Sequence, residues 1–175
     1  MATDARRGAR RRVVVTGMGA VTPLGNDVES MWQAAIEGRS GVARLSLVEP
    51  SNYPAQTGGE VKDFDPTLYM DRRDARRMAR FSQFAVAAAR QALAHSGLDL
   101  AHEDRGRIGV LLGNGGGGLP NTDETMRTIL ERGGSRVDPL FMAKMLPNMA
   151  GANVTIQLGL LGYTNTVSTA CAAGT

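Results

Sequence analysis

The sequence predicts an α/β fold in which helices cover a mostly parallel, buried sheet. Short runs of apolar or β-branched residues, typical of buried strands, occur at residues 13–15, 107–112 and 164–169. Longer segments with apolar residues at helical spacing separate these runs, and strands that alternate with helices favour parallel pairing. The chain has 175 residues, 42% of them hydrophobic, which is enough for one domain with a sizeable core.

The first predicted helix begins at Asn26, shortly after the first predicted strand. Glu29 follows three residues later and makes a near capping box, and Gly38 is placed to cap the other end. The face that we expect to be buried consists of Val28, Met31, Trp32, Ala35 and Ile36. Residues 39–66 contain prolines and glycines without a helical pattern. They predict an irregular excursion with one short strand near residues 59–61.

The longest helical pattern covers residues 72–96 and ends at Gly97. The apolar residues that recur on its predicted buried face are Met78, Phe81, Ala85, Ala88 and Ala92. Another helix is predicted over residues 121–132, with Met126, Ile129 and Leu130 facing inward. A fourth starts near Pro147 and ends at Gly159 and Gly162.

The charge and composition exclude several classes of protein. The net charge is +3, and five arginines among the first twelve residues make a basic start, which predicts that residues 1–10 form a disordered tail. No apolar run approaches the roughly 20 residues of a membrane span. Aromatic residues are only 5% of the chain and do not alternate with basic ones, which argues against nucleic-acid binding. The single cysteine excludes an internal disulfide and suits the cytoplasm.

Two glycine-rich stretches invite a nucleotide-binding interpretation that their details do not support. Gly17 and Gly19 begin a G-x-G-x-x-G pattern, but Thr22 stands where the third glycine belongs. These glycines are better explained by tight packing after a strand. Residues 114–118 form a second glycine loop, which lacks the Lys-Ser/Thr pair that a P-loop requires.

Cys171 is the candidate nucleophile. It follows the predicted strand at residues 164–169 and precedes the small residues 172–175, so it sits at a strand-to-helix turn. A thiol at a helix start faces unpaired N–H groups and the positive end of the helix dipole, and both favour the nucleophilic thiolate. The alternative is a small buried hydrophobic residue, as free cysteines often are. The turn alone leaves both interpretations open.

Four stretches of the chain resemble the β-ketoacyl-acyl carrier protein synthases, which are condensing enzymes of the thiolase fold. In order along the chain they are residues 12–19 with Thr22-Pro23-Leu24-Gly25, the loop 113–118, Pro147-Asn148-Met149-Ala150, and residues 167–175 around Cys171. The resemblance is greatest to synthase II of fatty acid synthesis. It implies that residues 11–175 are the N-terminal half of a thiolase-like domain, truncated just after the nucleophile.

The resemblance also implies roles for individual residues. Cys171 would be the nucleophile, and its backbone N–H would be one oxyanion donor. The other implied roles are contacts of Arg73, Arg76 and Arg77 with an acidic acyl carrier protein, and acyl-pocket positions for Gly116 and Phe141. Phe141 would reach toward the pocket of a second subunit in a homodimer. The chain departs from synthase II at Gly116, where a larger aliphatic residue is common, and at Tyr163, where proline is usual.

The activity that the resemblance implies is a decarboxylating Claisen condensation in the cytoplasm. It needs no metal and no organic cofactor beyond the phosphopantetheine arm of the carrier. The family's two catalytic histidines and lysine come from the second half of its members, so we expect these 175 residues not to condense acyl groups alone. A polyketide-type ketosynthase and a non-catalytic, carrier-binding or dimerising chain are the alternatives.

Overall fold

The computed structural model describes residues 12–49, 51 and 53–174, and the predicted tail at residues 1–10 lies outside them. The helices are α1 (Val28–Ile36), α2 (Arg72–Arg77), α3 (Arg80–Ser96), α4 (Leu119–Arg132), α5 (Phe141–Met145) and α6 (Met149–Leu158). The strands are β1 (Val42–Arg44), β2 (Thr57–Gly59), β3 (Val110–Gly113) and β4 (Thr164–Val167). The predicted α/β class is confirmed.

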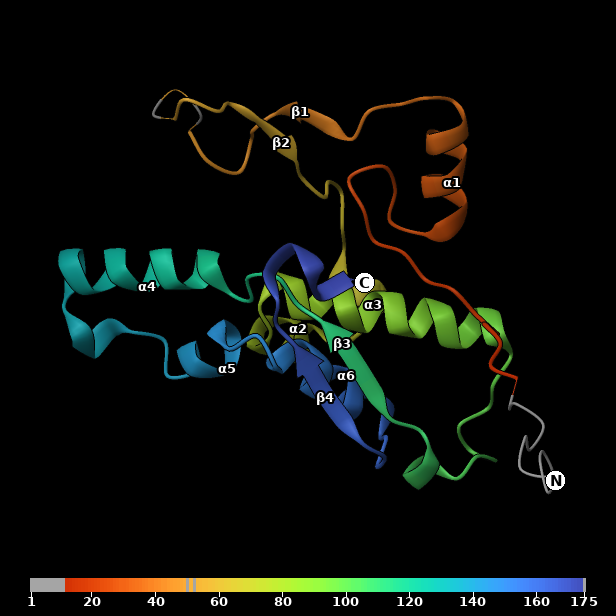
Figure 1. The fold of residues 1–175 in the computed structure, drawn as a ribbon. Helices are drawn as coiled ribbons and strands as arrows, with labels where there is room; N and C mark the ends of the chain where they lie inside the picture. The colour runs from red at the N-terminus through yellow and green to blue at the C-terminus, as the bar shows by residue number, and fades with distance from the viewer. Residues whose placement is uncertain (1–11, 50, 52, 175) are drawn as a thin grey trace, which may run out of the picture.

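The centre of the molecule is the parallel pair β3–β4, in which Val110 is opposite Thr164 and Gly113 is opposite Val167. Helix α6 packs against both strands on one side and against α3 on the other (Figure 1). The core cluster comprises Met70 before α2, Ala75 of α2, Met78 between α2 and α3, Val86 of α3 and Val154 of α6. The second sheet is the antiparallel hairpin β1–β2, so the short strand expected near residues 59–61 occurs two residues earlier.

The prediction of a buried strand at residues 13–15 is wrong. These three valines do not belong to a strand, and Val13 is 94% exposed. The reason is that the following residues are held along α3. The Met18 N–H donates to Nδ1 of His95 at 3.1 Å, and the Ala20 N–H donates to Oε1 of Gln91 at 2.9 Å. The valines therefore extend past the helix without reaching a neighbouring strand.

The two glycines of this segment permit its close approach to α3. A Cβ on Gly17 would overlap the carbonyl oxygen of Ala92, and one on Gly19 would overlap that of Ala88. Since glycine alone lacks this atom, the backbone can lie directly on the helix. Gly17 and Gly19 thus serve packing, as the sequence predicted.

Helix α1 begins two residues later than expected and buries little of its apolar face. Asp27 caps it, because its Oδ1 accepts the Ser30 N–H at 2.8 Å. The side chain of Asn26 is engaged elsewhere and donates to the carbonyl of Lys62. Trp32 and Ile36 are exposed, contrary to prediction, because α1 stands apart from the β3–β4 layer (Figure 1). The predicted cap Gly38 is confirmed, with φ of +69°.

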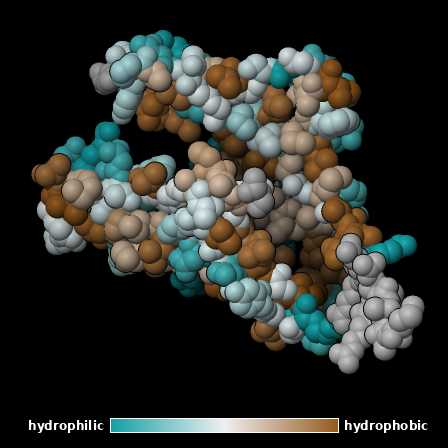
Figure 2. Space-filling model, in the orientation of Figure 1, coloured by the Kyte–Doolittle hydropathy of each residue, from teal (hydrophilic) through white to brown (hydrophobic). Residues whose placement is uncertain are grey.

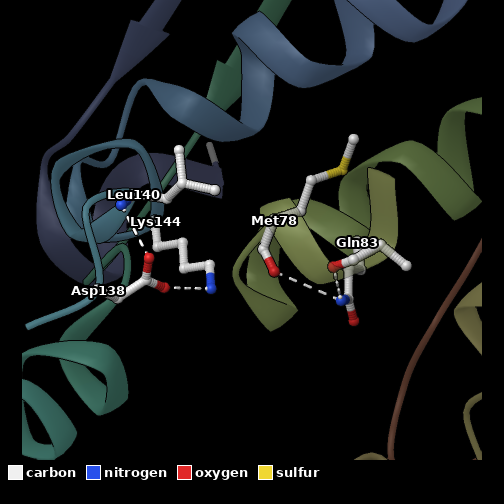
Figure 3. A network of polar contacts seen from close by, with 6 residues as sticks. Met78, Gln83, Asp138, Leu140 and Lys144 are labelled. Carbon is white, nitrogen blue, oxygen red and sulfur yellow. Dashed lines mark hydrogen bonds and ion pairs between the residues drawn. The ribbon is translucent and has the colours of Figure 1, made fainter. Parts of the chain in front are cut away.

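The helix predicted over residues 72–96 is broken into α2 and α3. Met78 and Ala79 between them are extended and buried. Gln83 of α3 reaches back across the break, and its Nε2 donates to the carbonyls of Ala75 at 2.7 Å and Met78 at 3.4 Å (Figure 3). In the break, both apolar residues lie in the core. The end of the helix at Gly97 is as predicted.

Helix α4 does not bury the residues expected to face inward, since Met126, Ile129 and Leu130 are all exposed. It packs on α5 and on the short 3-10 helix η4 (Gly134–Arg136), and extends away from the β3–β4 layer (Figure 1). Figure 2 shows apolar side chains at the surface at the far end of this arm and over α1. Helix α6 starts two residues after Pro147 and ends at Gly159, which has φ of +63°.

We predict that Gly19→Ala destabilises the fold, because the new Cβ would collide with the Ala88 carbonyl and force the segment off α3. The expected loss is about 1–3 kcal/mol in the free energy of unfolding, measured by urea denaturation. Gly134→Ala is the matched control, since no atom lies within 4 Å of its Cβ position. Equal stability of the two variants would contradict this account.

Candidate active site

Cys171 lies in a single turn at the carboxyl end of β4. The turn is the 3-10 helix η5 (Ala170–Gly174), and Ala170 at its start has φ of +50°, an uncommon conformation for a residue other than glycine. The thiol is free and exposed. The alternative of a buried hydrophobic residue is therefore wrong. The expected helix start is a turn of five residues, too short to provide the dipole of a full helix.

The glycine loop after β3 lies beside this turn. Because β3 and β4 are parallel, their carboxyl ends meet at one edge, where the Asn114 N–H donates to the carbonyl of Val167 at 2.8 Å. Gly113 lies so close to the Ala173 carbonyl that a side chain there would overlap it. A Cβ on Gly115 would lie 3.7 Å from the carbonyl oxygen of Ala170. The loop therefore forms one wall of the turn that carries the thiol.

Asn114 holds this edge together, a role that sequence reasoning missed. Its buried side chain donates from Nδ2 to the Pro147 carbonyl at 2.8 Å and accepts the Gly117 N–H at Oδ1 at 2.9 Å. It thus joins the end of β3 to the start of α6 and closes the glycine loop, in which Gly117 has φ of +59°. The signal in the sequence was an asparagine placed directly between a buried strand and a glycine run.

Gly116 is exposed at the outer side of the same loop. A Cβ there would lie 3.3 Å from Cδ1 of Leu119, itself an exposed side chain at the start of α4. The wall of the Cys171 turn is formed by Gly113 and Gly115 rather than by Gly116. The role of Gly116 in an acyl pocket stays a prediction.

Phe141 is half-buried at the start of α5 and lines a cavity of about 250 Å³ between α4 and α5. The other lining residues are polar or charged: Asn121, Glu124, Thr125, Thr128, Arg132, Arg136, Asp138 and Lys144. Asp138 fixes α5, because it accepts the Leu140 N–H at 2.8 Å and the Lys144 ammonium at 2.7 Å (Figure 3). The hydrogen bond from Lys144 lowers the pKa of the Asp138 carboxyl from its usual value. The acyl-pocket role of Phe141 likewise stays a prediction.

The predicted carrier-binding residues Arg73, Arg76 and Arg77 are exposed on α2. Within residues 12–49, 51 and 53–174, none of the three makes a recorded hydrogen bond or ion pair. Arg80, in contrast, belongs to the fold. It donates to the Val61 carbonyl at 2.7 Å and lies over the ring of Phe84, 4.9 Å from its centroid.

The two histidines are tied to other parts of the structure. Nδ1 of His95 accepts the Met18 N–H, and Nδ1 of His102 lies 2.8 Å from Oδ2 of Asp99. Among the described residues, no group of three or more His, Cys, Asp or Glu side chains could hold a metal ion. Nor does that part of the chain contain a helix long and apolar enough to cross a membrane.

The comparison with family models decides the relationship. The model for the beta-ketoacyl synthase N-terminal domain matches residues 10–175. The chain belongs to the beta-ketoacyl synthase family. The matched region contains both the thiol turn and the glycine loop. The fold is accordingly the N-terminal half of a thiolase-like ketosynthase, as the sequence predicted.

Curated relatives and solved structures agree with this membership. The chain is 43% identical over 166 residues to a 3-oxoacyl-[acyl-carrier-protein] synthase 2 of Vibrio harveyi, covering 95% of the chain and 40% of that protein. The protein of the same name from Synechocystis is 43% identical over 165 residues, which cover 94% of this chain and 40% of that protein. The chain therefore spans about 40% of the length of these curated relatives.

Two solved structures share the fold at lower identity. The ishigamide ketosynthase/chain length factor superposes with a TM-score of 0.85 and 27% identity, covering 92% of this chain and 40% of that one. A structure of a type II PKS acyl-carrier protein in complex with its ketosynthase superposes with a TM-score of 0.74 and 26% sequence identity. The match covers 94% of this chain and 44% of that one.

We predict that Gly113→Ala displaces the thiol turn, because its Cβ would overlap the Ala173 carbonyl. The expected result is a loss of about 1–3 kcal/mol of unfolding free energy, measured by urea denaturation. Gly174→Ala, whose Cβ position has no neighbour within 4 Å, should stay within about 0.5 kcal/mol of the parent chain. A Gly113→Ala chain as stable as Gly174→Ala would show that the loop does not form the wall of the turn.

Proposed function

We propose that these residues are the acyl-accepting portion of a 3-oxoacyl-[acyl-carrier-protein] synthase, with Cys171 as the nucleophile. The observation that carries the proposal is the exposed thiol in a 3-10 turn, which follows the left-handed residue Ala170 at the edge where two parallel strands end. This edge is where α/β folds place ligands. The exposure of Cys171 also argues against a chain that serves for interaction alone.

The first step is acyl transfer to the thiol. The Cys171 thiolate attacks the carbonyl carbon of an acyl-carrier thioester, and a C–S bond forms to cysteine while the carrier's sulfur leaves as a thiol after taking up a proton. The developing oxyanion accepts a hydrogen bond from the Cys171 backbone N–H. In the second step, malonyl-carrier loses carbon dioxide, and the resulting enolate attacks the acyl-cysteine and releases the thiolate. The product is a 3-oxoacyl-carrier two carbons longer.

The second step needs groups that the first does not. The described residues place no histidine on the elements next to Cys171, since His95 and His102 lie at and after the end of α3. The resemblance implies that the residues that polarise the malonyl group belong to the second half of the family's members, and this chain spans about 40% of its Vibrio harveyi relative. We propose that the 175 residues load an acyl group without extending it.

The partner would be an acyl carrier protein bound at Arg73, Arg76 and Arg77. Three exposed guanidinium groups without recorded ion pairs to described residues suit an acidic surface, and such a contact weakens with salt. We also propose that the protein acts as a homodimer in the cytoplasm. Met126 and Leu130 on α4 and Met142 on α5 are exposed apolar side chains of two helices that pack together, and they support burial against a second copy.

The fatty acid pathway is favoured over polyketide synthesis by sequence identity. The curated synthase 2 relatives are 43% identical, whereas the two solved ketosynthases described above are 26–27% identical. Gly116 and Phe141 are the proposed acyl-pocket positions. Transfer from a saturated acyl-carrier compared with a polyketide-type carrier substrate separates the two pathways.

The test is mass spectrometry of the chain after exposure to an acyl-carrier thioester. We predict an adduct of one acyl group on the parent chain and none on Cys171→Ala. Ser168→Ala is the matched control, because it removes a hydroxyl group three residues before Cys171 and should keep the adduct. Addition of malonyl-carrier should leave the mass of the adduct unchanged.

Two outcomes would contradict the proposal. An adduct that persists in Cys171→Ala would exclude Cys171 as the acyl acceptor, and its absence from the folded parent chain would show that these residues do not load an acyl group alone. Steady malonyl-dependent extension by the 175 residues would show that this portion contains a complete condensing site.

A further inference from the structure

Helix α2 carries an acidic residue in the middle of its arginines. Asp74 stands between Arg73 and Arg76, three residues before Arg77. Side chains three residues apart on a helix are neighbours, so the ordinary expectation is an ion pair between Asp74 and Arg77. Such a pair would neutralise part of the positive surface that faces solvent.

The structure shows the Asp74 carboxylate engaged elsewhere. Asp74 is half-buried, and its Oδ2 accepts a hydrogen bond of 2.8 Å from Nε2 of Gln157 on α6. No ion pair joins it to an arginine within the part of the chain that the structure describes. The carboxylate is held toward α6, while Arg77 stays exposed.

Gln157 is itself held in place from α3. The Nη2 of Arg90 lies 3.4 Å from both the backbone oxygen and the side-chain Oε1 of Gln157. An amide whose oxygen faces a guanidinium must present its NH2 group to the other side, where Asp74 accepts it. The cation Arg90 on α3, the amide of Gln157 on α6 and the anion Asp74 on α2 are therefore linked in that order.

We propose that Gln157 is a positioning residue for the arginine surface of α2, because it withholds the Asp74 carboxylate from Arg77 and so keeps the surface positive for an acidic partner. Without the amide donor, Asp74 loses its partner on α6 and is free to turn toward Arg77, which stands three residues further along the same helix. The identity of that partner as an acyl carrier protein rests on the proposed function.

The test compares affinities for holo-acyl carrier protein, measured by fluorescence anisotropy at low salt. We expect Gln157→Ala to weaken binding about threefold, the effect of one exposed ion pair. Adding Asp74→Asn to Gln157→Ala should restore parent affinity, because no carboxylate remains to pair with Arg77. Gln33→Ala is the matched control, since Gln33 bonds the exposed Glu37 on α1 and should change nothing.

Restoration by the second substitution separates this proposal from simple damage to α6, which Asp74→Asn would not repair. Equal affinity of Gln157→Ala and the parent, or a double variant as weak as Gln157→Ala, would overturn the proposal. If Gln157→Ala does not fold, the affinity of the single variant Asp74→Asn for the carrier protein tests the proposal. A change within twofold supports a withheld carboxylate, and a severalfold gain shows that Asp74 already screens the arginines.

A polyglutamate peptide as a second probe separates the two proposals. If the parent chain binds the peptide but not the carrier, and Gln157→Ala weakens the peptide complex, the positioning role of Gln157 holds and the proposed function fails. If the parent binds the carrier and Gln157→Ala binds both probes as the parent does, the function holds and the positioning role fails.

Discussion

The close approach of residues 17–20 to helix α3 is the constraint on which the rest of the structure depends. Gly17 and Gly19 place the backbone against the helix carbonyls, and Gln91 of α3 secures it. The side chain of Gln91 accepts the Ala20 N–H at 2.9 Å and donates to the Asn26 carbonyl at 2.7 Å and the Tyr69 hydroxyl at 3.0 Å. One amide thus joins the N-terminal segment, the approach to α1 and the segment before α2 to the same helix.

Helix α3 is also connected to the Cys171 turn, through its packing against α6. Val86 of α3 and Val154 of α6 share the core cluster, and α6 packs against β3 and β4. The bond from Asn114 to the Pro147 carbonyl then fixes the start of α6 to the edge where the strands end. The proposed carrier surface on α2 is joined to the same helix through Gln157. Helix α6 therefore connects both proposed functional regions, the arginine surface and the Cys171 turn.

The sequence predicted those parts of the fold whose signals are local. Gly38, Gly97 and Gly159 were correctly placed after helices, because a left-handed residue without a Cβ suits that position. The parallel strands were predicted because β-branched runs alternate with helical patterns. The turn around Cys171 was predicted from its small residues, although its 3-10 form was not.

The failures share a physical cause, which is that tertiary contacts override local pattern. Val13 to Val15 resemble a strand, but the next residues are held by α3 and no described strand pairs with them. The helix at residues 72–96 breaks because Met78 and Ala79 are drawn into the core and Gln83 satisfies the freed carbonyls. The spacing of apolar residues predicts which face of a helix is buried. It does not predict where the helix breaks, because that depends on the position of the core. The position of Asn114 before a glycine run was a local signal, but its partner Pro147 lies 33 residues away and could not be inferred from neighbouring residues.

The central claim is that the α2 arginines and Cys171 serve one acyl transfer, in which the first bind the carrier and the second receives its cargo. The most direct measurement is the initial rate of Cys171 acylation from an acyl-carrier thioester and from a small acyl thioester without a carrier, for the parent chain and for the triple variant Arg73→Glu, Arg76→Glu and Arg77→Glu. The account predicts that the triple variant slows transfer from the carrier at least about tenfold at low salt and leaves transfer from the small thioester unchanged. Equal slowing with both donors, or none with either, would contradict it.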